Sequence, residues 1–483
     1  MQILGIMKIL GLLIALFSIT LLPPIAVSLW YMDQAHDAFI LSLLIILTTG
    51  AMCWFPARHY RGELRFRDGF LIVVLIWVVL SIMAAIPLLL VHRPELRIVD
   101  ALFESTSGLT TTGATILTAI DDLPLSVLYY RQQLQWLGGM GIIVLAVAVM
   151  PALGVGGMQL YRAETPGPMK DHKLTPRITE TAKAIWRIYL GLTVLCGASY
   201  YFAGMSVFDA ISHAFSTVAI GGFSTHEASL GYFQSNAINL VATVFMLLAG
   251  LNFALHFSAF RFRRVAVYIN DPEAKAYFGL LLLTIMLTVM TLHHHQVYEQ
   301  LSDNIVQGMV QVVSIVTTTG FTTTNFSIWP TFIPILLILL STAGGCAGST
   351  AGGMKIIRML LLFKQGAREI SKLVHPSALI PIKLGGKPVP DNVVNAVWGF
   401  LSLYIFSYAI LLIMLLATGA DLTTAFSAVT ACLNNLGPGL GDVSRNYASI
   451  SDTGKIILTF AMVLGRLELF TLLVLFTPVF WKG

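Results

Sequence analysis

Charged side chains are scarce in this chain of 483 residues. Only 11% of the residues are Asp, Glu, Lys or Arg, whereas 56% are hydrophobic. Soluble domains carry about 25% charged residues and about 45–50% apolar ones. A globule with so few charges could not cover its surface with groups that water solvates. The scarcity therefore excludes a soluble enzyme, a disordered chain and a protein with a nucleic-acid partner.

Cysteine is also sparse. The chain has four, Cys53, Cys196, Cys346 and Cys432, at wide spacings and in apolar surroundings. Their spacing matches neither a disulfide framework nor a metal site. We expect four reduced residues that fill space.

Long apolar runs are what the sequence has in abundance. A helix needs about 20 such residues to cross a bilayer, whereas the strands of a membrane barrel show only weak alternation. The first run, after Lys8 and up to Asp33, holds 24 uncharged residues, more than the apolar core of a secretory signal. We predict an all-α integral membrane protein with about ten transmembrane helices. The expected spans are 9–31, 38–55, 69–91, 134–156, 184–204, 235–257, 276–292, 331–361, 393–418 and 455–480, of which 134–156, 331–361 and 455–480 are irregular.

The positions of the basic residues support this topology. If the N-terminus is cytoplasmic, 23 of the 29 lysines and arginines fall in cytoplasmic segments. Because such segments are enriched in Lys and Arg, we predict that both termini are cytoplasmic. The same basic loops would also suit docking of a cytosolic partner. The residues expected outside are Arg93, Arg97, Arg131, Arg445 and Lys455, and Arg466 falls within the last span.

Four shorter apolar stretches recur between the spans, each suited to a re-entrant half-helix rather than a crossing. Written to end on glycine, they are DALFESTSGLTTTG (100–113), DAISHAFSTVAIGG (209–222), QGMVQVVSIVTTTG (307–320) and TAFSAVTACLNNLG (424–437). They predict four pseudo-repeats of helix, re-entrant pore loop and helix around a central ion pore. The expected units are an N-terminal two-helix hairpin (1–68) and pore repeats 1 (69–183), 2 (184–270), 3 (271–390) and 4 (391–483).

The glycine that ends each stretch indicates the chemistry. A half-helix that stops inside the membrane directs the negative end of its dipole toward a cation. Glycine permits a positive φ, and carbonyl oxygens in the loop can replace the hydration shell of the ion. No charged residue lies between Asp303 and Lys355, so a selectivity ring of charged side chains is not expected. A single loop of this kind would equally suit a turn between packed helices, but four in register favour an ion path.

The glycine loops resemble those of a known family. The loops TTTGAT, AIGGFST, TTTGFTT and NNLGPGL, with the runs GGMQLYRAETPGP (156–168) and GGCAGST (344–350), are similar to the TrkH family of the Trk/Ktr/HKT superfamily. Its members are potassium-transporting membrane subunits of bacterial Trk uptake systems, and the resemblance covers essentially the whole chain. It implies a homodimer in the bacterial inner membrane with a cytosolic, nucleotide-binding TrkA-like subunit. It also implies potassium as the substrate, without a bound cofactor.

The resemblance also implies roles for individual residues. A serine at the first glycine goes with sodium permeation in related transporters, so glycine in all four loops points to potassium. The turn would come from Gly113, Gly222, Gly320 and Gly437, where equal repeat length selects Gly222 over the adjacent Gly221. Potassium would contact the backbone carbonyls just before each glycine, at Thr111, Thr112, Ile220, Gly221, Thr318, Thr319, Asn435 and Leu436.

The span 331–361 contains GGCAGSTAGG (344–353). Because glycine costs about 1 kcal/mol against alanine inside a helix, a regular helix is not expected there. A close-packing face of small residues is one alternative, and a phosphate-binding loop is another, although its Gly-Lys-Ser/Thr order is absent. The resemblance instead implies an unwound gating loop below the filter. The gate would comprise Gly344, Gly345, Cys346, Ala347, Gly348, Ser349, Thr350 and Arg466.

Arg466 is the basic residue placed inside a predicted span. An arginine at the centre of a membrane helix costs at least about 2.5–3.5 kcal/mol and usually faces a cavity or a partner. Arg466 could pair with Glu468 or extend to the membrane surface. In the gating interpretation it donates hydrogen bonds to carbonyls of the 344–353 loop and repels cations while the gate is closed.

Two modes of transport are compatible with the sequence. We expect channel-like conduction driven by the membrane potential. A potassium symporter coupled to protons or sodium would need a titratable group on the path, for which Glu468 and His256 are the candidates. An intramembrane enzyme or a receptor is disfavoured, because no half-helix offers a catalytic constellation.

Several further polar residues have ordinary interpretations. His293, His294 and His295 could form a metal cluster but better suit a solvated outer loop. Asn252 suits a packing or pore-lining role, and Glu104 is expected to bond to neighbouring backbone.

Overall fold

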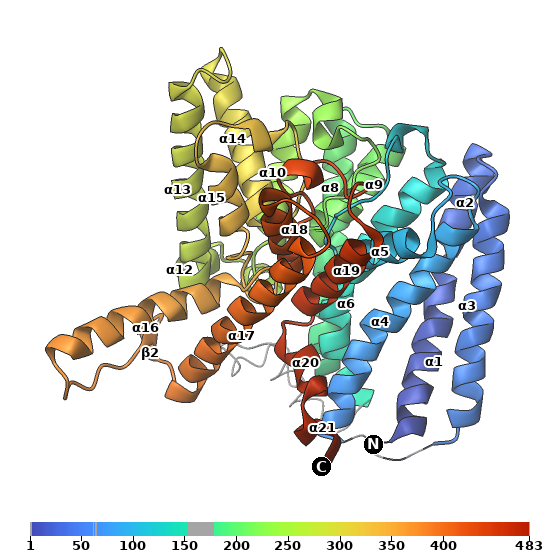
Figure 1. The fold of residues 1–483 in the computed structure, drawn as a ribbon, viewed down its shortest axis with the longest axis horizontal. Helices are drawn as coiled ribbons and strands as arrows, with labels where there is room; N and C mark the ends of the chain where they lie inside the picture. The colour runs from blue at the N-terminus through green and yellow to red at the C-terminus, as the bar shows by residue number, and fades with distance from the viewer. Residues whose placement is uncertain (1, 61, 63–64, 153–177, 483) are drawn as a thin grey trace.

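Helices account for nearly all of the regular structure (Figure 1). The computed structural model describes residues 2–60, 62, 65–152 and 178–482. Within these ranges the only strands are the antiparallel pair β1 (Lys383–Leu384) and β2 (Lys387–Pro388). The predicted all-α fold is therefore confirmed. The run GGMQLYRAETPGP and the expected cytoplasmic residues Arg162, Lys170, Lys173 and Arg177 lie outside the described residues.

Three helices form the predicted N-terminal hairpin. They are α1 (Ile3–Ile19) and α2 (Leu22–Tyr31), which follow one another, and α3 (His36–Ala57), which packs along α1. Glycines make this contact close. A Cβ on Gly11 would lie 2.5 Å from the backbone nitrogen of Trp54, and one on Gly50 would lie 2.6 Å from that of Ala15. Small residues at such interfaces let the backbones of membrane helices approach each other.

In the described residues that follow, one order of elements occurs four times: a helix, a short helix that ends at a glycine loop, and a further helix. The first set is α4 (Phe66–Leu90), α5 (Ile98–Leu109) and α6 (Leu125–Ala152), and the second is α8 (Ile178–Phe202), α9 (Val207–Ala219) and α10 (Asn236–Ala249). The third is α13 (Pro272–His294), α14 (Leu301–Val316) and α15 (Ile333–Leu340), and the fourth is α17 (Asp391–Leu416), α18 (Leu422–Asn434) and α19 (Asp452–Arg466). Connecting helices are α11 (Phe253–Phe262), α12 (Ala266–Asn270), α16 (Ile356–Val374), α20 (Phe470–Leu473) and α21 (Pro478–Lys482).

One predicted span differs from the structure. The span 235–257 is not straight, because α10 and α11 meet at an angle of 93°. The span 331–361 is not one helix, as its glycine-rich run predicted, since α15 ends at Leu340 and α16 begins only at Ile356. The irregular span 455–480 is bent by 108° after α19. Helices occupy all ten predicted positions, but only five in the described part of the chain are long and apolar enough to cross by themselves, so the count of ten stays a prediction.

The outward faces of the long helices are apolar. Leu283 and Met290 on α13 and Ile413 on α17 are each about two-thirds exposed. Lipid tails would cover such faces, because the backbone groups of a helix already pair within it. Both chain termini lie at the same end of the molecule (Figure 1), as the predicted topology requires.

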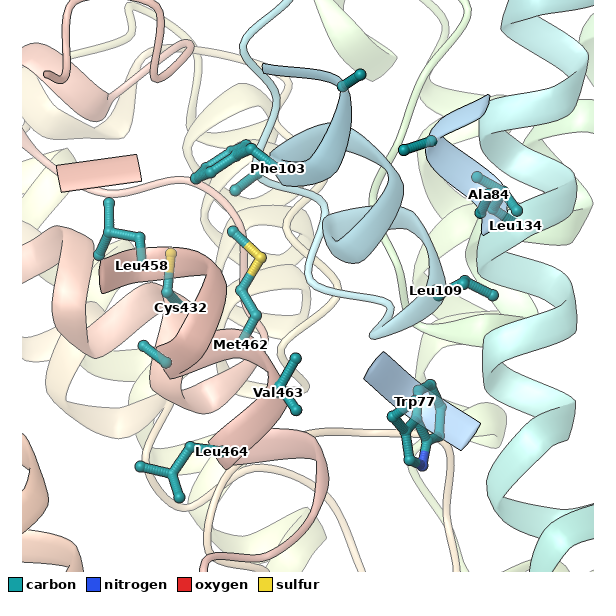
Figure 2. Close-up of a cluster of buried hydrophobic side chains, with 14 of the residues drawn as sticks. Trp77, Ala84, Phe103, Leu109, Leu134, Cys432, Leu458, Met462, Val463 and Leu464 are labelled. Atoms are coloured by element: carbon teal, nitrogen blue, oxygen red, sulfur yellow. The ribbon is translucent and has the colours of Figure 1, made fainter. Parts of the chain in front are cut away.

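The first and last sets of helices pack together and thereby close the arrangement. Figure 2 shows their shared core, in which Phe103 and Leu109 of α5 belong to one cluster with Trp77 of α4 and the α19 side chains Met462 and Val463. Cys432 of α18 belongs to the same cluster. All four cysteines are free and three are buried, as expected for residues that fill space.

Candidate ion pathway

The four short helices end in loops with one shared backbone conformation. Two residues before each glycine, Thr111, Ile220, Thr318 and Asn435 have φ between 54° and 67°. The glycines themselves, Gly113, Gly222, Gly320 and Gly437, have φ between 78° and 95°. Gly221 is not among the residues with positive φ, so the structure supports Gly222 as the equivalent glycine. A positive φ is strained for most side chains, and its recurrence at four aligned positions marks the loops as equivalent.

The four loops close into a ring. A Cβ on Gly113 would lie 2.1 Å from the carbonyl oxygen of Gly221, and one on Gly222 would lie 2.0 Å from that of Thr319. A Cβ on Gly320 would lie 2.2 Å from the carbonyl oxygen of Leu436, and one on Gly437 would lie 2.7 Å from that of Thr112. Each glycine thus abuts the carbonyl just before the next glycine, and the fourth loop returns to the first. Any larger residue would collide with this backbone.

The ring forms the floor of a polar cavity of about 550 Å³. All four glycines line it, together with residues that follow them, including Thr115, Ser224, Thr323 and Tyr447. Charged residues stand around this cavity, among them Asp121, Arg131 and Arg445. The loops themselves carry no charge, as the sequence indicated.

Side-chain hydrogen bonds support the ring from behind. Gln135 on α6 donates from Nε2 to the carbonyl of Gly221 at 2.6 Å and accepts at Oε1 from the backbone nitrogen of Phe223 at 3.1 Å. The hydroxyl of Tyr447 donates to the carbonyl of Gly437 at 2.6 Å, and Asn435 Nδ2 donates to Thr112 Oγ1 at 3.0 Å. Sequence reasoning missed Gln135 and Tyr447. The only sequence feature that could have indicated these two residues is a polar group where an apolar residue would be expected.

Arg131, one of the residues expected on the outer side, is buried in the protein. It is only 1% exposed and its Nε lies 2.7 Å from Glu104 Oε1. Glu104 also accepts a hydrogen bond from the backbone nitrogen of Ile116 at 3.0 Å, which confirms the expected bond to neighbouring backbone. The sequence did not indicate that these two charges form a pair.

The segment 341–355 lies against the inner ends of the short helices. Thr350 Oγ1 donates to the carbonyl of Val218 in α9, and the backbone nitrogen of Gly352 donates to Thr318 Oγ1 just after α14. The backbone nitrogen of Gly353 donates to the carbonyl of Asn434, the last residue of α18. The segment therefore touches three of the four short helices directly behind their glycine loops.

The bend between α10 and α11 anchors the same segment. The backbone nitrogen of Cys346 donates to the carbonyl of Gly250 at 2.8 Å, and that of Phe253 donates to the carbonyl of Gly348 at 3.0 Å. Glu273, at the start of α13, accepts at Oε1 from the backbone nitrogens of Ala347 at 2.7 Å and Ile357 at 3.1 Å. These bonds use backbone groups that a continuous helix would have satisfied internally, which explains why the span 331–361 is interrupted.

Arg466 lies between this segment and α6. Its guanidinium is buried and donates to the carbonyls of Thr350 at 3.3 Å and Gly138 at 3.1 Å. The alternative pairing with Glu468 is not observed, because Glu468 bonds instead to Arg358. Arg466 is also not the only cation inside the described part of the molecule. Arg131, Lys355, Arg358 and Lys455 are buried as well.

The remaining polar candidates have structural partners. Asn252 caps the N-terminus of α11, and the ring nitrogens of His256 bond to the hydroxyl of Tyr268 and the carbonyl of Leu248. His293 and His294 lie in the last turn of α13 and His295 caps it, so they do not form the loop that was expected. Within the described ranges, no group of three or more His, Cys, Asp or Glu residues could hold a metal ion.

A helical membrane protein whose short helices converge on a ring of glycine loops belongs to the class of membrane transport proteins. The chain belongs to the TrkH family of cation transport proteins, which it matches over residues 35–482.

Named relatives extend this similarity over the full length. The chain is 54% identical to the Trk system potassium uptake protein TrkH of Vibrio parahaemolyticus serotype O3:K6, covering 100% of both chains. The chain is 53% identical to the Trk system potassium uptake protein TrkH of Escherichia coli strain K12, over 99% of both chains. It is 40% identical to the Trk system potassium uptake protein TrkG of the same strain, over 98% of this chain and 97% of TrkG. These relatives are named as transport proteins and not as enzymes, as the sequence predicted.

The fold matches a solved structure as well. The crystal structure of the potassium transporter TrkH from Vibrio parahaemolyticus aligns with a TM-score of 0.92 and 52% identity, covering 100% of both chains.

Proposed function

We propose that this chain takes up potassium across the inner membrane of a bacterium by channel-like conduction through the ring of glycine loops. The observation that carries the proposal is the recurrence of one backbone conformation at four aligned positions, closed into a ring by contacts between each glycine and the next loop. The full-length relatives named as potassium uptake proteins support potassium as the substrate, with no cofactor.

The potassium ligands in this proposal are the backbone carbonyls of the two residues before each glycine. Uncharged loops suit a monovalent cation, because carbonyl dipoles replace water without holding the ion too tightly to leave. The carbonyl of Gly221 accepts a hydrogen bond from Gln135, and its second lone pair remains for an ion.

The gate in this proposal is the segment 344–350 together with Arg466. Contacts of Thr350, and of Gly352 and Gly353 directly after it, with the ends of three short helices favour a position across the ion path. The positive charge of Arg466, held near the carbonyl of Thr350, would repel a cation while the segment stays in place.

The assembly in this proposal is a homodimer that binds a TrkA-like, nucleotide-binding subunit on its cytoplasmic side. The full-length relatives are named for a Trk system, which supports assembly with a further component of such a system. The position of both termini at one end of the molecule supports a cytoplasmic location for the two together.

Growth on low potassium tests the proposal. The chain, co-expressed with a TrkA-like subunit, is introduced into bacterial cells that lack their own potassium uptake. We expect growth at micromolar external potassium, whereas empty-vector cells grow only when potassium is abundant. Failure of rescue by a protein that reaches the membrane would refute the proposed function.

Reversal potentials distinguish conduction from coupled transport. Of the two titratable candidates for coupling, Glu468 is bonded to Arg358, and His256 is bonded through both ring nitrogens. Because these groups already have partners, we expect reversal potentials in proteoliposomes to follow the potassium gradient alone. A shift with the proton or sodium gradient would favour the symporter.

A further inference from the structure

A buried ion pair stands behind the junction between the first two glycine loops. Glu104 of α5 is fully buried and Arg131 of α6 is 1% exposed. Their Oε1 and Nε atoms are 2.7 Å apart. The charges are opposite, so the pair adds no net charge beside the ion path. An electrostatic role in attracting potassium therefore does not explain it.

The pair bonds to the segment after the first glycine. Both carboxylate oxygens of Glu104 lie 3.0 Å from Thr115 Oγ1, and Oε2 also accepts from the backbone nitrogen of Ile116. Arg131 Nη2 lies 3.1 Å from the same hydroxyl. Glu104 and Arg131 together therefore fix the position of residues 115–116.

The pair also contacts the segment after the second glycine. Arg131 Nη1 donates to the carbonyl of Ser224 at 3.4 Å, and the guanidinium lies over the ring of Phe223 at 4.2 Å. One turn further along α6, Gln135 bonds to both sides of Gly222. A single guanidinium thus joins the loop that follows Gly113 to the loop that follows Gly222.

Thr115 extends this connection to the fourth loop. Its carbonyl accepts a hydrogen bond from the backbone nitrogen of Tyr447 at 2.7 Å, and the hydroxyl of Tyr447 in turn bonds to the carbonyl of Gly437. Three of the four loops therefore meet at residues that Glu104 and Arg131 position. Buried ion pairs are often no more stabilising than apolar packing, whereas buried polar groups can specify one geometry.

We propose that Glu104 and Arg131 are positioning residues that set the spacing of the ring and thereby its discrimination between potassium and sodium. The inference rests on the proposed function, because it assumes that the ring selects the ion. A small change in the separation of the loops alters how well their carbonyls replace the hydration shell of potassium, which is larger than sodium.

The test compares potassium and sodium uptake by the full-length protein with its TrkA-like subunit in proteoliposomes. The variant Glu104→Gln/Arg131→Gln neutralises both partners at once, so that no unpaired charge stays buried. We expect its potassium-to-sodium uptake ratio to fall about tenfold, while potassium uptake itself falls less than about threefold. A purely structural role would lower the amount of folded protein and leave the ratio unchanged.

The matched control is a second buried pair in the same helix. Lys455 Nζ lies 2.6 Å from Asp100 Oδ1 in the first turn of α5, about one turn before Glu104 and farther from the ring along the helix. Asp100→Asn/Lys455→Gln should leave the ratio at the wild-type value. An equal fall in both double variants would overturn the proposal.

A milder substitution keeps the proposal testable if the double variant does not reach the membrane. Thr115→Val preserves shape but removes the hydroxyl that Glu104 and Arg131 share, and we expect a smaller fall in the ratio. If wild-type protein is selective and neither variant changes the ratio, this inference fails alone. If wild-type protein does not take up potassium, the proposed function itself fails.

Discussion

The ring of glycine loops and the segment 341–355 are both rich in glycine, yet they are held in different ways. Each ring glycine abuts a backbone carbonyl of the next loop, and this contact recurs four times. The segment 341–355 is held by unlike bonds: backbone bonds to the α10–α11 bend, the carboxylate of Glu273 and the guanidinium of Arg466.

This difference indicates different tasks. Backbone contacts repeated around a closed ring constrain one another, which favours a single geometry. Individual hydrogen bonds contribute about 0.5–1.5 kcal/mol each, so a segment held by several of them can leave its site when a partner favours the open state. The ring therefore suits selection of the ion, and the segment suits gating. Variants of the two regions should alter different measurements.

The largest effect is expected at the ring. Gly222→Ala places a Cβ at a φ of +78°, 2.0 Å from the carbonyl of Thr319. We expect potassium uptake to fall about a hundredfold or more, because the loop must leave its position. Uptake of a potassium tracer in cells measures this loss.

Two glycine variants serve as controls for this prediction. Gly279→Ala on α13 has open space around its Cβ and should behave as wild type. Gly221→Ala would meet mainly the movable side chain of Gln135, so its loss should be smaller than that of Gly222→Ala. The reverse order would show that the second loop is aligned wrongly by one residue.

The next effect is expected at Arg466. Arg466→Ala removes the donor to the carbonyls of Thr350 and Gly138 together with the buried positive charge. Without the TrkA-like subunit, we expect ion flux to rise about tenfold, with an unchanged potassium-to-sodium ratio. Flux into proteoliposomes measures both. A changed ratio would mean that the two regions are not separate in function.

A smaller effect of the same kind is expected at Glu273. Glu273→Ala removes the acceptor for the backbone nitrogens of Ala347 and Ile357. We expect flux without the TrkA-like subunit to rise about threefold, since only neutral donors lose their partner. Glu273→Gln keeps an acceptor oxygen and should stay close to wild type. Equal flux in the two variants would argue against the hydrogen bonds as the cause.

The smallest effect is expected at the mouth of the cavity, where His226 joins two loops. Burial alone would lower the pKa of His226, but its bonds to Asp209 and Asp121 outweigh this and raise the pKa above the ordinary 6.5. The ion pairs therefore stabilise the fold fully below pH 6.5 and lose this contribution as the pH rises through the raised pKa. The ring of His226 also stacks on Tyr232.

Thermal unfolding of purified protein across this pH range tests the effect. Wild type should lose its excess stability over His226→Gln as the pH rises, and the two curves should converge at alkaline pH. A constant difference at every pH would assign the stabilisation to stacking on Tyr232 rather than to charge.

Much of the candidate pathway could be predicted because its pattern is local. A half-helix with a terminal glycine is encoded within 14 consecutive residues, so spacing alone predicts the four loops and the alignment on Gly222. The glycine-rich run at 344–353 was likewise recognisable as a poor helix. Such features depend on backbone propensity, which neighbouring residues determine.

The partners of buried charges could not be predicted in the same way. The pairing of Arg131 was not predicted because Glu104 lies 27 positions away on another helix, and Arg358 meets Glu468 across 110 positions. The bend at Gly250 was not predicted, because it lies in an apolar run whose composition indicates one straight span. Its cause is the docked segment 341–355, which takes the backbone bonds that the helix gives up.

Hydropathy and backbone preference act over short stretches, and they are enough to specify a helical membrane protein with four uncharged glycine loops. The closure of these loops into a ring, the side chains that hold them and the place of the segment 341–355 depend on helix packing. These contacts join residues that are far apart in the chain and meet only when the helices pack.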